Sequence, residues 1–312
     1  ILELKKIIKE IKIFSPDLII AIGGGGVIDY SKIANASIHI NNLNLILKKK
    51  VRFRKFRKLL IVPTTTGSGA EVTPGAVLYK NKIKYNLRDK SLIPDNYSYQ
   101  PQLISNSNKK LKISSAFDSL SQSIESLISF KSNKKSQKYS QLSISLILRN
   151  YKKFFSTNDY KAIRNMQIAG NFSGKAIAIT STGAPHALSY YISSTFKLYH
   201  GISVMMNLPS VLEYNLENKY LLKKRYKKEF EYRINLLKKA LGVKNEKKIL
   251  DKINAIIKFS KINLKIQKRL FNLVKQKKAI NINRLKNNPI EISYSQILKF
   301  NEKIFTWRRL KR

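Results

Sequence analysis

Two of the three histidines in this chain lie close together, His186 in the segment GAPHALSY and His200 in the segment YHG. Upstream, Asp118 and Gln122 stand four residues apart, so on a helix their side chains share one face. Carboxylate, amide and imidazole groups can together hold one divalent metal, with the neutral amide as the weakest ligand. These four residues therefore predict a metal site. Ordinary hydrogen-bonded core histidines are the alternative.

A second candidate is a run of four glycines: Gly23, Gly24, Gly25 and Gly26. The run follows the apolar segment 18–22, which predicts a buried parallel strand, and precedes a helix expected over 27–36. Without side chains, the backbone N–H groups at the start of such a helix can approach a phosphate. Tight turn geometry is the alternative, because the run is not the G-x-G-x-x-G fingerprint. Asp29 is expected to cap the helix or orient this loop.

A third candidate is the hydroxyl-rich turn that begins at Thr64. It follows a second apolar strand, predicted over 59–63, and offers the hydroxyls of Thr64, Thr65, Thr66 and Ser68 among glycines. Ligands of parallel sheets bind at the carboxyl ends of strands, where both loops are predicted to lie. A plain Ser/Thr turn is the alternative for one such loop. Two loops at successive strand ends predict a ligand site more strongly than either does alone.

The charge of the chain is extreme, at +43 from 61 basic and 18 acidic residues in 312. Basic residues are spread over every segment, with no zinc knuckle or clean basic helix, so biased nucleotide composition explains the charge better than nucleic-acid binding does. The absence of cysteine excludes disulfides and thiolate ligands and fits a cytoplasmic location. No apolar run approaches the ~20 residues of a membrane-spanning helix, so we expect no membrane partner.

The pattern along the chain changes near residue 106. Strands and turns alternate before it, after an amphipathic helix at 1–13, whereas amphipathic helical patterns dominate after a polar segment at 100–112. The helices are predicted over residues 114–130, 136–155, 159–179, 208–216, 222–241, 247–259 and 295–306. An α/β fold with an N-terminal parallel sheet and an all-helical C-terminal domain follows. Because the first residue is Ile, we expect the N-terminal part to be missing.

Three motifs carry a family resemblance. The segment AIGGGGVIDYSK resembles the G-G-G-S-x-x-D-x-A-K loop of the iron-containing (group III) alcohol dehydrogenases, and PTTTGSGAEVT resembles their P-T-T-A-G-T-G-S-E-V-T segment. Asp118, Gln122, His186 and His200 fall where the metal ligands of that family stand. Within the family, the segments KYNL, DSLSQSIES, APHALSY and RLKNNP look most like the phosphonoacetaldehyde reductase (hydroxyethylphosphonate dehydrogenase) branch. Ser181 stands where that branch is expected to have a basic residue.

The resemblance implies a dinucleotide-binding domain at 1–106, a metal-binding helical domain at 107–312, and an active site between them. NAD(P)H would contact the glycine loop, Asp29, Thr64, Thr65 and Ser68. Lys84 is a further candidate contact, with an ordinary surface lysine as the alternative. Fe(II), with Zn(II) as the alternative, would be held by the four ligands. His186 and His200 would thereby be catalytic, and Tyr190 would relay a proton or simply pack.

The expected reaction is hydride transfer between NAD(P)H and a small aldehyde or alcohol, with phosphonoacetaldehyde as the favoured substrate. Three alternatives stay open: an alcohol dehydrogenase acting on an uncharged alcohol, a decayed inactive homologue, and a basic nucleic-acid-binding protein. The last predicts salt-sensitive binding to DNA. A homo-oligomer is compatible with the sequence.

Overall fold

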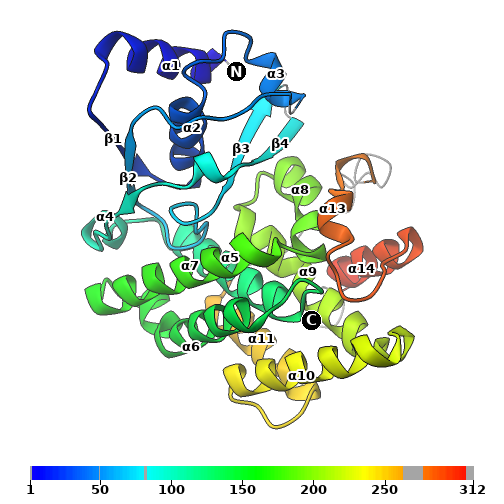
Figure 1. Cartoon of the computed structure of the whole chain (residues 1–312). Helices are drawn as coiled ribbons and strands as arrows, with labels where there is room; N and C mark the ends of the chain where they lie inside the picture. Colours follow the sequence, from blue (N-terminus) through cyan, green and yellow to red (C-terminus); the bar gives the residue numbers. More distant parts are fainter. Residues whose placement is uncertain (1, 49, 81–82, 263–276, 307–312) are drawn as a thin grey trace.

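The computed structural model describes residues 2–48, 50–80, 83–262 and 277–306. Figure 1 shows the strands and the first helices gathered at one end of the molecule, while the helices that follow residue 109 occupy the other end. The expected change of character along the chain is therefore also a division in space. No described helix is long and apolar enough to span a membrane.

A three-stranded parallel sheet, in the order β1-β2-β5, forms the centre of the N-terminal part. Its strands are β1 (Leu18–Gly23), β2 (Lys58–Pro63) and β5 (Asn96–Tyr97). In the β1–β2 register Gly23 pairs with Pro63. The glycine loop and the threonine loop therefore leave the sheet side by side at one edge, as the two predicted strands require.

Strand β1 differs from the prediction in one respect. Its Ala21 and Gly23 are buried, but Leu18, Ile20 and Ile22 are 46%, 54% and 58% exposed. Successive side chains of a strand point to opposite faces, so only one face of β1 is covered. That face packs on α2 (Gly25–Ala36), which follows the glycines directly. The expectation of a fully buried strand was wrong for the second face.

Around the sheet lie elements that the sequence predicted only in part. The expected N-terminal helix is present as α1 (Leu2–Phe14), which packs on α2. Unpredicted elements are the antiparallel hairpin of β3 (Gly75–Lys80) and β4 (Ile83–Arg88), the short helix α3 (Asn44–Leu47) and the 3₁₀ turn η1 (Lys90–Leu92). The hairpin packs against α2.

The C-terminal part is built around one buried helix, α5 (Lys109–Ile128), in which every residue from Lys112 to Ile128 is buried. Packed directly on it are α6, α7, α8, α9 and α10. The bounds of the remaining elements are α4 (Gln102–Ser105), α6 (Lys134–Ser156), α7 (Tyr160–Thr180), α8 (Ala184–Phe196), α9 (His200–Glu217), η2 (Lys219–Leu221), α10 (Lys224–Leu241), α11 (Lys247–Ser260), α13 (Ile282–Leu285) and α14 (Tyr294–Thr306).

Three helical predictions need correction. Helix α9 begins at His200 rather than at 208, and Pro209 lies inside it. Helix α8 was not among the predicted helices, because its sequence alternates small and polar residues without a clear apolar stripe. The expected irregular segment at 100–112 contains α4 and the start of α5, whose N-cap Asn108 accepts a hydrogen bond from the N–H of Lys110.

The threonine loop also joins the two parts of the molecule. Gly69 adopts a left-handed φ of +59°, and a Cβ there would lie 2.4 Å from the Cα of Gly174 on α7. The hydroxyls of Thr66 and Ser115 lie 2.7 Å apart, and Ser119 donates to the carbonyl oxygen of Thr66 at 2.7 Å. Glycine and small polar residues therefore let this loop approach α5 and α7 at backbone distance.

A buried lysine holds the same loop from the other side. The Lys32 ammonium, on α2, donates to the carbonyl oxygens of Ala70 at 2.9 Å and Thr73 at 2.7 Å, and also to that of Gly75. Burial lowers the pKa of Lys32 to about 8, although the nearby carboxylates of Asp29 and Glu71 act in the opposite direction. The helix after the glycine loop is thus tied to the segment after the threonine loop.

Candidate active site and metal centre

One face of α5 carries the acidic and amide groups of the site. Asp118, Gln122 and Glu125 follow one another at intervals of four and three residues, which places them on the same side of the helix. All three are buried. The sequence predicted the first two of these residues but not Glu125.

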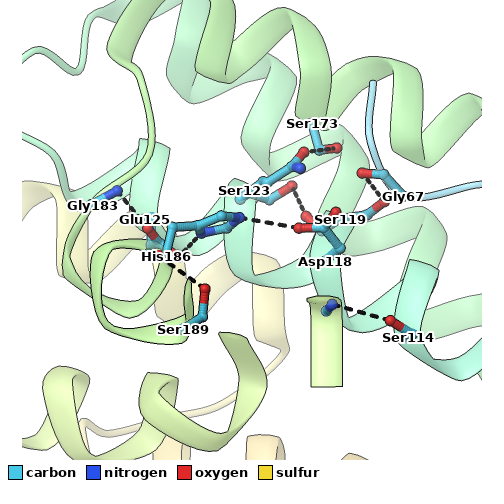
Figure 2. Close-up of polar contacts among 12 residues, drawn as sticks. Gly67, Ser114, Asp118, Ser119, Ser123, Glu125, Ser173, Gly183, His186 and Ser189 are labelled. Carbon is cyan, nitrogen blue, oxygen red and sulfur yellow. Dashed lines mark hydrogen bonds and ion pairs between the residues drawn. The ribbon is translucent and has the colours of Figure 1, made fainter. Parts of the chain in front are cut away.

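The structure brings both predicted histidines to this face. One ligand atom from each of Asp118, His186 and His200 lies within 4.8 Å of the other two, and His186 Nε2 is 3.1 Å from Asp118 Oδ1. Figure 2 shows His186 and Asp118 pointing toward one another from α8 and α5. One carboxylate and two imidazoles at such separations fit a divalent metal such as Fe(II) or Zn(II).

Glu125 orients His186. Its Oε1 accepts from His186 Nδ1 at 2.6 Å and its Oε2 accepts from the backbone N–H of Gly183, as Figure 2 shows. An ionised carboxylate is acceptor-only, so the proton sits on Nδ1 and the lone pair of Nε2 faces Asp118. A carboxylate behind a ligating histidine is the usual support of a metal site. The i, i+3 spacing from Gln122 was the available sequence signal for this residue.

The electrostatics of His186 agree with a cation between it and Asp118. Burial acts to lower the pKa of His186, but the carboxylates of Glu125 and Asp118 outweigh it, so the pKa is raised overall. Without a proton or a metal, Nε2 and Asp118 Oδ1 would be two acceptors 3.1 Å apart. A metal ion between these two atoms would satisfy both acceptors, and so would a second proton on His186.

His200 is placed by the residue that follows it. A Cβ on Gly201 would lie 1.9 Å from the carbonyl oxygen of Ser114, and the N–H of Gly201 donates to Ser114 Oγ at 3.0 Å. Only glycine permits the start of α9 to approach α5 this closely. His200, the first residue of α9, thereby reaches the same face as Asp118.

Gln122 and Tyr190 surround this cluster. Gln122 lies one helical turn after Asp118, and its Oε1 accepts a hydrogen bond from Ser173 Oγ at 2.9 Å. The Tyr190 ring stacks on His200, with the centroids 6.0 Å apart and the planes at 11°. Burial raises the pKa of Tyr190 to about 12, so this phenol keeps its proton at neutral pH. The roles of Gln122 as fourth ligand and of Tyr190 as proton relay stay predictions.

The two loops at the sheet edge face each other. A Cβ on Gly24 would lie 3.4 Å from Thr65 Cγ2, a Cβ on Gly25 would lie 3.2 Å from Ser68 Cβ, and nothing lies within 4 Å of a Cβ on Gly26. Gly24 is also the N-cap of α2 and offers no side chain to the first N–H groups of the helix. A phosphate accepted by these N–H groups fits this end of the helix.

Three other predicted residues of the cofactor site, Thr64, Asp29 and Lys84, differ in their contacts. The Thr64 N–H donates to the carbonyl oxygen of Gly23 at 3.0 Å, which links the two loops, whereas Asp29 Oδ2 accepts from the N–H of Val77 on β3 at 3.0 Å. Asp29 therefore ties α2 to the hairpin rather than capping the helix, whose N-cap is Gly24, and its role in cofactor binding stays a prediction. Lys84 lies on β4, and its side chain is outside the described part of the structure.

Comparison with known proteins assigns the family. Residues 1–101 match the family model described as iron-containing alcohol dehydrogenase, and residues 112–304 match the one described as Fe-containing alcohol dehydrogenase family, C-terminal. The chain belongs to the iron-containing alcohol dehydrogenase family. The resemblance seen in the sequence motifs is confirmed at the level of the family.

Curated relatives match over about two thirds of the chain. The 4-hydroxybutyrate dehydrogenase of Clostridium kluyveri is 33% identical over 203 residues, which cover 64% of this chain and 54% of that protein. An alcohol dehydrogenase of Thermococcus barophilus is 29% identical over 233 residues, which cover 71% and 60%. The aligned region thus spans little more than half the length of these relatives.

Solved structures share the fold over nearly the whole chain. The sulfoacetaldehyde reductase from Bifidobacterium kashiwanohense, in complex with NAD⁺, superimposes with a TM-score of 0.83 at 20% identity, over 97% of this chain and 80% of that one. An iron-containing alcohol dehydrogenase from Thermococcus thioreducens gives a TM-score of 0.84 at 21% identity, over 98% and 82%. The predicted fold class is confirmed: a parallel sheet with helices followed by a largely helical remainder.

Proposed function

We propose that this chain catalyses metal-dependent hydride transfer between NAD(P)H and a small aldehyde. The observation that carries this proposal is the cluster of Asp118, His186 and His200, whose ligand atoms lie within 4.8 Å of one another. The reaction consumes an aldehyde, NAD(P)H and one proton and yields an alcohol and NAD(P)⁺. When bound, a divalent metal would polarise the carbonyl oxygen and the nicotinamide would supply the hydride.

The residues of the chain bind and orient the reactants. Asp118, His186 and His200, with Gln122 as the fourth member, hold the metal, and Glu125 fixes the tautomer of His186 so that Nε2 faces the site. The N–H groups of the glycine loop bind the pyrophosphate, with Thr65 and Ser68 opposite them. The ring of Tyr190 stacks on His200, and its hydroxyl keeps its proton at neutral pH. Tyr190 donates this proton to the substrate oxygen, which becomes negatively charged on hydride transfer.

The favoured substrate is phosphonoacetaldehyde, reduced to 2-hydroxyethylphosphonate. Its support is the resemblance of the segments around Gln122, Asn287 and Asn288 to that branch of the family. Asn287 and Asn288 are buried close behind the site, where Asn287 Nδ2 donates to the carbonyl oxygens of Thr180 and Thr182 at 2.8 and 3.1 Å. The fold is shared with a sulfoacetaldehyde reductase, which is named for another two-carbon aldehyde with an acidic group.

The domain boundary, the cellular location and the oligomeric state predicted from the sequence are also parts of this proposal. We place the division between the dinucleotide-binding and helical domains at 106/107, within the interval between the two matched family models. We place the enzyme in the cytoplasm, which the absence of cysteine fits, and a homo-oligomer is compatible with the sequence. Nucleic-acid binding has no support beyond the net charge of +43.

The test combines metal analysis with kinetics. Purified protein loaded with Fe(II) or Zn(II) is assayed with NADH and NADPH on phosphonoacetaldehyde, butanal and lactaldehyde. We expect turnover of at least one aldehyde, with the highest kcat/KM for the phosphonate. A phosphonate no better than butanal would refute the substrate and leave an alcohol dehydrogenase for uncharged substrates. No turnover of any aldehyde by metal-loaded protein would identify an inactive homologue.

A further inference from the structure

We propose that Arg284, together with Arg88, forms an anion-binding subsite beside the metal centre and recognises the acidic group of a small charged aldehyde. The inference rests on the proposed function for the identity of the substrate, but its binding test does not require turnover. It assigns the charged end of the substrate to two residues that the sequence analysis left without a role.

Arg284 lies over an aromatic ring that contacts one of the candidate metal ligands. Its Cζ is 5.3 Å from the centroid of the Tyr190 ring, which is the ring that stacks on His200. The side chain comes from α13, which packs on α8, the helix that carries His186. A cation over an aromatic face is held in a defined position at low cost in flexibility. Arg284 is therefore fixed beside the candidate active site.

The second arginine reaches the same region from the hairpin. Arg88 ends β4, and its Nη2 donates to the carbonyl oxygen of Ala178 on α7. Asn86, two residues earlier, accepts from Arg284 Nη2 at 3.3 Å. The two guanidinium groups are thus drawn together from the N-terminal and C-terminal parts of the molecule. Burial lowers the pKa of Arg88, and the charge of Arg284 lowers it further.

Neither guanidinium has an acidic partner among the described residues, whose ion pairs involve His186 and other arginines and lysines. In so basic a chain an unpaired surface arginine is ordinary. Arg284 is different because it is only partly exposed and because its Nη2 donates to Asn86, two residues before the exposed Arg88 on the same strand. Two like charges held together are unfavourable unless an anion joins them. The arrangement is one that a doubly or singly charged oxyanion would stabilise.

The chemistry of the pair selects a class of ligand. A guanidinium presents a planar fork of N–H donors that matches phosphonate, sulfonate or carboxylate oxygens. A substrate with its carbonyl oxygen at the metal ligands and its oxyanion at Arg284 would pass the edge of Tyr190. The shared chemistry is an oxyanion on a short aldehyde, and the choice among the three acids is left to the experiment. Ser181 stands where the phosphonoacetaldehyde reductase branch is expected to have a basic residue. Arg284 would supply that positive charge from another part of the chain.

The test measures binding of 2-hydroxyethylphosphonate, isethionate and 3-hydroxypropionate to metal-loaded protein by calorimetry, together with NADH affinity. The variants are Arg284→Gln, Arg284→Lys and Arg88→Gln. Lys286→Gln is the matched control, because it removes the same charge from an exposed position two residues away. We expect Arg284→Gln to weaken binding of the preferred anion about tenfold to a hundredfold, Arg284→Lys to recover part of it, and Lys286→Gln to change it less than about threefold.

Steady-state kinetics supply the second readout. The ratio of kcat/KM for the charged aldehyde to that for butanal should fall by the same factor in Arg284→Gln. An equal loss in Lys286→Gln would overturn the subsite in favour of a general field effect, and a loss of NADH affinity instead of anion affinity would assign the arginines to the cofactor. If wild type reduces butanal but binds none of the three anions, the subsite and the favoured substrate fail, while the proposed hydride transfer to a small aldehyde stands. Anion binding lost in Arg284→Gln, in a protein without turnover, would support the subsite alone.

Discussion

The two halves of the candidate active site are built on opposite principles. The candidate metal centre consists of the buried side chains of Asp118 and His186 and the partly exposed side chain of His200, which converge from α5, α8 and α9; Glu125 holds His186 in place. The candidate dinucleotide loop offers backbone N–H groups and depends on the absence of side chains at Gly24 and Gly25. Removing side-chain atoms should therefore weaken metal binding at the first site, whereas adding side-chain atoms should weaken cofactor binding at the second.

The two halves also differ in how far they depend on residues that are distant in sequence. The metal centre needs α5, α8 and α9 to pack correctly, and Gly201 to admit α9. The loop needs mainly its own strand and helix, together with the clamp that Lys32 forms on the segment after Gly69. The following predictions test these differences, beginning with the largest expected effect.

Removal of one histidine should abolish the metal site. His200→Ala leaves one carboxylate and one imidazole of the three described ligands, too few for a stable site. Elemental analysis should fall from about one metal per chain to trace amounts. The control is His39→Ala, which changes the third histidine, at an exposed position. Equal metal in wild type and His200→Ala would disprove the site.

The buried ammonium of Lys32 should make the free energy of unfolding depend on pH in the alkaline range. The folded pKa of about 8 lies below the ordinary 10.5 because burial disfavours the ammonium, so the unfolded chain binds more protons between these values. The free energy of unfolding of wild type should therefore rise relative to Lys32→Met between pH 8 and pH 10.5, by up to about 3 kcal/mol. Urea denaturation across this range measures it, with Lys286→Met as the exposed control. A difference that does not change with pH would contradict the prediction.

Loss of the support behind His186 should weaken metal binding without removing a ligand. Glu125→Gln keeps the shape of the side chain but replaces the charge that holds His186 Nδ1–H. Metal affinity should fall about tenfold to a hundredfold. Competition with a chelator measures this affinity, and circular dichroism checks that the variant folds. Unchanged affinity in a folded variant would show that Glu125 is only a structural partner of Gly183.

An added side chain should affect the loop and spare the metal. Gly24 has φ −78°, which valine adopts, and its Cβ would meet Thr65 at an ordinary 3.4 Å, so Gly24→Val should fold. Its methyl groups should obstruct the approach of a pyrophosphate and weaken NADH or NADPH binding about tenfold, or roughly 1.4 kcal/mol. Fluorescence titration tests this. Gly75→Ala is the control, because its Cβ would meet only the carbonyl oxygen of Leu87, at an ordinary 3.9 Å, and metal content is the second readout. Unchanged cofactor affinity would move the phosphate site elsewhere.

The sequence by itself determined the parts of this protein that depend on local order. The apolar runs before Gly23 and Thr64 predicted two parallel strands, because short uninterrupted apolar segments bounded by turns are typical of buried strands. The spacing of Asp118 and Gln122 predicted one helix face, and the rarity of histidine singled out His186 and His200. Each of these inferences needs only residues that are near in sequence, or the count of a residue type.

Tertiary structure alone decided what depends on distant partners. Glu125 is one buried polar residue among many on α5 until His186 and Gly183 come within hydrogen-bonding distance of it. The early start of α9 follows from the contact of Gly201 with Ser114, which outweighs the local signal of Pro209. Arg284 and Arg88 lie 196 positions apart and approach each other only because the hairpin and α13 meet near α8. Packing between segments far apart in sequence has no local signature, so these groups become a site only in the folded chain.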